Sequence, residues 1–182
     1  MYLAGKVMMN RNAPDYLMDT TRQGELDCRS LIEDWDGKGR NHYVITPRFA
    51  ITSTPDQLKS AGRLHAEYPS TYIQTHLSEN LGEIESVLSL CPGHADYLEV
   101  YERAGLLTDR SIFGHCVHLT IGNISGWEKR EHYRPLPDLE PFPWKRIIRY
   151  EGSEPLRRTY YLGDRCRCGY IFLYVAYDGR GL

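Results

Sequence analysis

The sequence predicts an α/β fold built on a parallel sheet, open or barrel-like, followed by an irregular tail. Up to Leu119, short runs of apolar and β-branched residues alternate with longer runs that carry an apolar helical face. Such βαβαβαβ alternation is typical of right-handed parallel sheets. After about Thr120 this pattern stops, so we divide the chain at 1–119 and 120–182.

The first predicted unit joins an apolar strand at residues 3–9 to a helix through a polar turn at residues 10–14. Asp19, Thr20 and Thr21 can cap this helix, and glycines at 37 and 39 end it. The spacing of four apolar residues approximates one helical face: Leu26, Cys28, Leu31 and Ile32.

The second unit begins with a strand at residues 42–45, which we expect to end at Ile45 or Thr46 because Pro47 cannot donate to a sheet. Arg48 then lies at the strand end, where a guanidinium could hold a carbonyl or carboxylate. A surface arginine beside a packed Phe49 is the alternative. A helix starts at residues 53–55, with its inner side formed by Leu58, Ala61 and Leu64.

The third strand lies in residues 71–80, TYIQTHLSEN, and ends in His76 with Glu79 three residues later. Helices follow at 82–90 and 95–107, and a short strand at 111–115 ends in His115. Carboxyl ends of parallel strands meet at one edge, so Arg48, His76, Glu79 and His115 are expected to converge there. A structural histidine with a helix-capping glutamate is the alternative for His76 and Glu79.

Composition excludes several classes of protein. A net charge of -2 and a pI near 6.4 offer no basic surface for nucleic acid. No run of residues is apolar for the length of a membrane span, and the N-terminus lacks a signal-peptide pattern. Five irregularly spaced cysteines are typical of a cytoplasmic protein with free thiols. The spacing of Cys166 and Cys168 does not match a zinc knuckle.

The converging residues suit hydrolytic attack on an amide or amidine carbon, with ammonia leaving. Two neutral imidazoles, His76 and His115, could bind one zinc ion, which lowers the pKa of bound water toward about 7. Glu79 is placed to carry the proton, and Arg48 to orient a substrate carbonyl. His118 is expected to be an outer or surface group. No ligating companions are evident for His42, His65 and His94.

Four segments resemble, in order and spacing, the middle of guanine deaminases of the amidohydrolase superfamily. These are GKVMMNRNAPDYLMDT, YVITPRFAITST, YIQTHLSEN and FGHCVHL, within residues 4 to about 119. The resemblance implies a partial TIM-like (β/α) barrel with zinc as cofactor, and hydrolysis of guanine to xanthine and ammonia in purine catabolism. It further implies a homodimer.

The resemblance also assigns roles to individual residues. His76 and His115 match metal ligands, and Glu79 matches the proton-shuttling carboxylate. Arg48 and Phe49, together with His76 and Glu79, match the guanine-binding set. The family's His-x-His motif and its aspartate, in an A-T-D-V-G-type motif, are not found in the written sequence. The predicted zinc site is therefore incomplete.

The tail, residues 120–182, suggests a frameshift. Residues 136–149 and 163–181, back-translated and read one nucleotide later, permit CPTSNLFLGSGLF and ATDVGAGTSFSTLRTMDEG. Both strings resemble guanine deaminases, and the second contains the missing aspartate. The hypothesis is a frameshift near residues 120–125. We then expect the tail to pack poorly, the partial barrel to leave two sheet edges unpaired, and GYIFLYVAY at 169–177 to favour aggregation.

Three alternatives remain open at the level of sequence. The tail could instead be a proline-rich linker followed by a small β element at 169–177. The chain could be an inactive α/β fragment or pseudogene product. It could also be a binding module that reuses part of a barrel.

Overall fold

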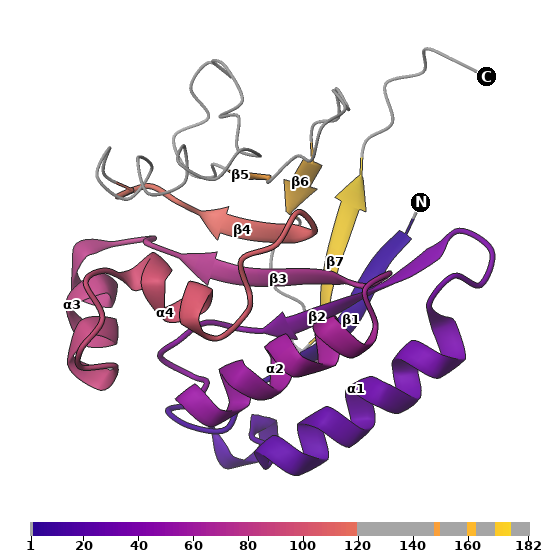
Figure 1. The fold of residues 1–182 in the computed structure, drawn as a ribbon, viewed down its shortest axis with the longest axis horizontal. Coiled ribbons are helices and arrows are strands. Elements are labelled where there is room, and N and C mark those ends of the chain that lie inside the picture. Colours follow the sequence, from indigo (N-terminus) through magenta and orange to yellow (C-terminus); the bar gives the residue numbers. More distant parts are fainter. Residues whose placement is uncertain (1, 120–147, 150–159, 163–169, 176–182) are drawn as a thin grey trace.

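The computed structural model describes residues 2–119 and three short strands at 148–149, 160–162 and 170–175 (Figure 1). Predictions about the packing of the other tail residues, and about Cys166 and Cys168, lie outside the described residues. The division between 119 and 120 stays a prediction. Among the described residues, no helix is long and apolar enough to cross a membrane.

Four parallel strands form the centre of the sheet, as predicted. They are β1 (Tyr2–Met8), β2 (Asn41–Pro47), β3 (Tyr72–Leu77) and β4 (Ser111–His115), and they lie side by side in that order. Register pairs such as Val7 with Thr46 and His76 with Gly114 align their carboxyl ends. The predicted parallel α/β sheet is therefore confirmed.

Both edges of this parallel sheet are paired, which corrects the expectation of two unpaired edges. The strand β7 (Tyr170–Val175) runs antiparallel to β1, and β6 (Tyr160–Leu162) continues the sheet beyond it. The two-residue strand β5 (Ile148–Arg149) runs antiparallel to β4. These backbone ladders satisfy donors and acceptors that an open edge would leave to water. Three short strands are therefore described within the tail, and the expectation that it is irregular stays a prediction.

The helices connect the parallel strands, and the first two begin at the predicted caps. After a 3₁₀ turn at Asp15–Leu17, α1 (Thr21–Trp35) is capped by Thr20, and α2 (Pro55–Glu67) is capped by Thr54 with Pro55 in its first turn. These two helices lie side by side along the sheet, whereas α3 (Leu81–Leu90) and α4 (Tyr97–Arg103) lie together near one end of it (Figure 1).

Three local predictions need correction. The strand β2 continues through Pro47, which can take the last position because a strand end needs no further donor. The helix predicted at 95–107 spans only Tyr97–Arg103, because Asp96 caps its start and Gly105 adopts a φ of 76° after its end. Leu26 is 48% exposed, and the inner face of α1 uses Gly24, Cys28 and Ile32 instead.

The core lies between the sheet and the helices. It is formed by alternate strand residues, including Tyr43, Ile45, Ile73 and Phe113, packed against helix residues such as Leu58. α2 approaches the turn after α4 so closely that a Cβ at Gly62 would lie 2.0 Å from the Ala104 carbonyl oxygen. Only glycine fits this crossing.

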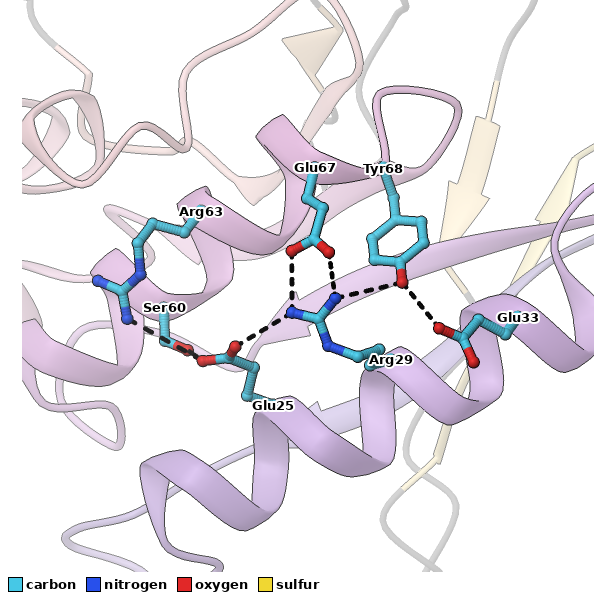
Figure 2. Close-up of polar contacts among 7 residues, drawn as sticks. All are labelled: Glu25, Arg29, Glu33, Ser60, Arg63, Glu67 and Tyr68. Carbon is cyan, nitrogen blue, oxygen red and sulfur yellow. Dashed lines mark hydrogen bonds and ion pairs between the residues drawn. The ribbon is translucent and has the colours of Figure 1, made fainter.

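A polar network on the outer side joins α1 to α2 (Figure 2). Arg29 binds both carboxylate oxygens of Glu67, and its Nη1 donates to the Tyr68 hydroxyl at 3.2 Å. That hydroxyl donates to Glu33 at 2.9 Å. Glu25 accepts from the Ser60 hydroxyl. These contacts fix the relative position of the two helices.

Candidate active site

Two histidines meet at the carboxyl ends of β3 and β4. His76 is the penultimate residue of β3, and His115 is the last residue of β4. Their rings lie 5.0 Å apart between centroids, at an angle of 89°. The predicted convergence of these two side chains is therefore present, and it results from the parallel register of the strands.

Non-glycine residues with positive φ cluster at the same strand ends. Ser78, His115 and Cys116 have φ values of 50°, 70° and 55°. This conformation is costly for residues with a Cβ and occurs often at functional sites. Backbone hydrogen bonds hold it: the Cys116 amide donates to the Leu77 carbonyl at 2.8 Å, and the His118 amide to the Ser78 carbonyl at 3.1 Å.

Glu79 lies beside the histidine pair and does not cap the helix. Its Oε2 is 3.5 Å from Nε2 of His115, and half of its side chain is exposed. The cap of α3 is Asn80, whose side chain accepts from the Glu83 amide at 2.9 Å. The alternative of a helix-capping glutamate at position 79 is therefore wrong. The carboxylate remains available to a small molecule near His115.

Arg48 and Phe49 approach the same place from the end of β2. The Arg48 carbonyl accepts from the His76 amide at 3.0 Å, so the two strand ends are directly joined. The Phe49 ring centroid lies 5.8 Å from the His76 ring, and the Arg48 guanidinium lies 5.2 Å from the Phe49 ring. Both side chains are half-buried. An aromatic face and a planar cation thus lie next to the histidines.

Comparison with known proteins identifies the relatives of this region. Over 117 residues, 64% of this chain and 27% of the relative, the sequence is 54% identical to guanine deaminase from Escherichia coli strain K12. The chain is related to the guanine deaminases. It spans about a quarter of the length of the curated guanine deaminases it matches. No protein-family model matches the chain.

Solved guanine deaminases share the fold of the described region. The E. coli guanine deaminase structure superposes with a TM-score of 0.65 at 52% identity, covering 66% of this chain and 28% of that one. Guanine deaminase from Bradyrhizobium japonicum gives 0.68 at 38% identity, covering 72% and 28%. Guanine deaminase from C. acetobutylicum, with guanine bound in its active site, gives 0.63 at 32% identity, covering 69% and 30%. These likenesses confirm the predicted amidohydrolase-type α/β fold.

The donor set fits a zinc ion only in part. Imidazole suits zinc, and His76 and His115 are close enough to serve one ion from two strands. Within the described residues, however, no three His, Cys, Asp or Glu side chains form a group that could hold a metal ion. A catalytic zinc of the kind expected for guanine deaminases needs at least one more protein ligand.

The other histidines of the described region have structural surroundings. His65 is buried and pairs with the Thr71 hydroxyl at 3.1 Å, and His94 pairs with the Cys91 carbonyl at 2.9 Å. His42 lies edge-on to the Tyr72 ring. His118 is half-buried beyond the end of β4, consistent with the outer position predicted for it.

The cysteines described are free and buried, as predicted for thiols outside any disulfide. They are Cys28, Cys91 and Cys116. Burial raises the pKa of the Cys28 thiol to about 11, so this group stays protonated and inert at neutral pH.

Sequence reasoning missed the tyrosines that join these loops. The sequence patterns predict a helix here but assign no role to Tyr97 or Tyr101. Both are buried, and both hydroxyls lie near the His76 carbonyl oxygen. Their spacing of four residues on one helix was the available signal, but nothing in it revealed which backbone groups they would meet.

Proposed function

We propose that this chain carries part of the active site of a guanine deaminase, which hydrolyses guanine to xanthine and ammonia. The observation that supports this proposal is the meeting of His76, His115 and Glu79 beside Arg48 and Phe49. It lies in a region 54% identical to a guanine deaminase. The guanine-bound C. acetobutylicum structure supports the choice of substrate.

In this proposal the purine is held by Arg48 and Phe49. A guanine base offers a flat π face and a carbonyl acceptor. The Phe49 ring can pack on the face, and the planar Arg48 guanidinium can donate to the carbonyl oxygen. Because the Arg48 backbone is bonded to the His76 amide, the bound base would lie next to the histidine pair.

Glu79 is proposed to move the protons. Deamination forms a C–O bond to the ring carbon that carries the amino group and breaks its C–N bond. The oxygen of the attacking water becomes a carbonyl of the product, so the water gives up both protons, one to the adjacent ring nitrogen and one to the leaving amine. A half-exposed carboxylate next to His115 can accept each proton from the oxygen and deliver it to the nitrogen.

His76 and His115 are proposed as two ligands of a zinc ion. When bound, zinc would lower the pKa of a coordinated water toward about 7 and supply a nucleophile at neutral pH. The remaining ligands would have to come from outside the described residues. Purine catabolism, a cytoplasmic location and a homodimer are further proposals from the same relationship.

A second candidate is an α/β protein without catalytic activity. It is favoured by one observation, namely that the described residues contain no three-residue metal group. In this case the two histidines would keep their contact without retaining zinc.

Metal content and turnover separate the two candidates. The purified 182-residue protein would be analysed for zinc by plasma mass spectrometry and for ammonia release from guanine. The proposed enzyme is expected to contain zinc, at less than one ion per chain because the described ligand set is incomplete, and to release ammonia slowly. Absence of both would overturn the enzyme proposal and leave the inactive alternative.

Two variants sharpen this experiment. Glu79→Gln is expected to keep the zinc and lower turnover by about a hundredfold or more, because the amide cannot carry a proton. His115→Ala is expected to lose zinc and turnover together. Equal zinc retention in His115→Ala and the unmodified protein would contradict the ligand assignment.

A further inference from the structure

The hydroxyl of Tyr101 lies where the two loops of the candidate site come together. Tyr101 is on α4 and is fully buried. Its hydroxyl donates to the His76 carbonyl oxygen at 2.7 Å and accepts from the Ala50 amide at 3.1 Å. The Thr75 hydroxyl also donates to it, at 3.1 Å. One side chain oxygen therefore satisfies backbone groups from two separate segments.

These two segments carry the proposed substrate and metal residues. Ala50 directly follows Arg48 and Phe49, and Thr75 directly precedes His76. Thr75 adds a second link, since its hydroxyl lies 3.3 Å from the Arg48 carbonyl oxygen. Movement of either segment would break a hydrogen bond to a buried group, which is costly because no water replaces it.

Tyr97 provides an internal comparison. It is almost as buried as Tyr101, and the two rings lie 5.3 Å apart. Its hydroxyl lies 3.1 Å from the Tyr101 hydroxyl and 3.4 Å from the His76 carbonyl oxygen. Its hydroxyl also hydrogen-bonds with the side chain of the buried Glu83. Removing either hydroxyl costs one buried polar group, but only Tyr101 reaches the Ala50 amide.

A packing role alone does not account for the geometry at Tyr101. A buried tyrosine hydroxyl usually finds a hydrogen-bond partner, and the Tyr101 hydroxyl meets partners on two separate segments. Here the hydroxyl accepts a hydrogen bond from the amide of Ala50, which follows Arg48 and Phe49. It also donates a hydrogen bond to the carbonyl oxygen of His76. We infer that Tyr101 is a positioning residue, which sets the distance between the guanine-holding segment 48–50 and His76. This inference rests on the proposed function.

Hydrogen exchange tests this inference without any need for activity. The 182-residue protein would be compared with Tyr101→Phe and Tyr97→Phe, each of which keeps its ring and loses one hydroxyl. In Tyr101→Phe, exchange of the Ala50 amide is expected to accelerate by about tenfold or more relative to the core amide of Ile73. In Tyr97→Phe, the ratio of these two rates is expected to change by less than about threefold.

A ring contact provides the second readout. Phe49 and His76 have ring centroids 5.8 Å apart, so a nuclear Overhauser effect between them is expected. It should weaken in Tyr101→Phe and persist in Tyr97→Phe. Equal effects of the two substitutions, or acceleration of all amides together, would overturn the positioning role.

The unmodified protein offers a test that does not depend on the variants folding. A hydroxyl proton buried between Tyr101 and the His76 carbonyl should exchange slowly with water and give a separate resonance. Its absence would contradict the geometry on which the inference depends.

Turnover separates this inference from the proposed function. If the protein releases ammonia from guanine, Tyr101→Phe is expected to raise KM about tenfold with zinc content unchanged. An unaltered KM would overturn the inference for catalysis. If the unmodified protein has no turnover, the proposed function fails, whereas the exchange experiment still decides whether Tyr101 joins the two segments.

Discussion

At the scale of single residues, His65 couples stability to pH. Burial lowers the pKa of this histidine from its usual value of 6.5, and its Nδ1 pairs with the Thr71 hydroxyl. The folded state therefore resists a proton that the unfolded chain accepts. The neutral His65 therefore contributes to the free energy of unfolding. This contribution is complete above about pH 6.5 and is lost as the pH falls toward the pKa of His65 in the folded state.

We therefore expect the free energy of unfolding to decrease from about pH 7 to pH 5, with a smaller decrease in His65→Gln. Urea titrations at several pH values would measure it. The comparison with His65→Gln is necessary because a second group also couples stability to pH. Burial raises the pKa of the Glu83 carboxyl, which makes the folded state more stable as the pH falls, the opposite of the effect of His65. Parallel pH profiles for the two proteins would show that His65 is not the source.

At the scale of elements, the pairing of α1 with α2 depends on Arg29. Its guanidinium spans both helices through Glu67 and Tyr68 and also bonds Glu25 on its own helix (Figure 2). Bidentate geometry and several partners make this network stronger than an isolated surface pair. It holds the pKa of Glu67 below its usual value through the hydrogen bonds from Arg29.

Arg29→Ala is expected to lower Tm by about 2 °C or more at low salt, and by less at about 1 M salt, where exposed charges are screened. Calorimetry at the two salt concentrations measures the difference. Arg22→Ala is the matched control, because Arg22 is exposed on the same helix and makes no bridge to α2 among the described contacts. A Tm loss that is identical in both variants would argue against the network.

At the scale of the whole molecule, the reading frame of residues 120–182 determines how much of the proposed active site this chain can contain. The curated relatives match about two-thirds of the chain, and the one-nucleotide shift offers family-like sequence for residues 136–149 and 163–181. The shift would also supply the aspartate that the written sequence lacks. The frameshift therefore remains our hypothesis for the unmatched part.

Sequencing the gene across codons 118–126 tests it, and a single inserted or deleted nucleotide is the expected result. A chain expressed from the restored frame is then expected to bind more zinc than the written chain, since it gains an acidic ligand. An intact frame at this junction, or equal zinc binding by the two chains, would count against the hypothesis.

The fold of the first 119 residues could be predicted because local signals and topology agree. Thr20 and Thr54 act as helix caps where expected, and the alternation of strands and helices admits one handedness. The start and end of α4 were less predictable, because Leu106 is apolar and buried yet lies beyond the helix. Leu106 is thus buried and follows the spacing of a helical face, although the chain is not helical at this position.

The sequence by itself determined the strand-end positions of Arg48, His76 and His115, since hydrophobic runs and their polar ends are local properties. Only the tertiary structure decided that Glu79 turns to His115 while Asn80 caps the helix, and that Tyr101 joins residues 48–50 to His76. These contacts connect segments far apart in the chain. They depend on how α4 and the loops are placed against the strands, which the pattern of residues within one segment does not fix.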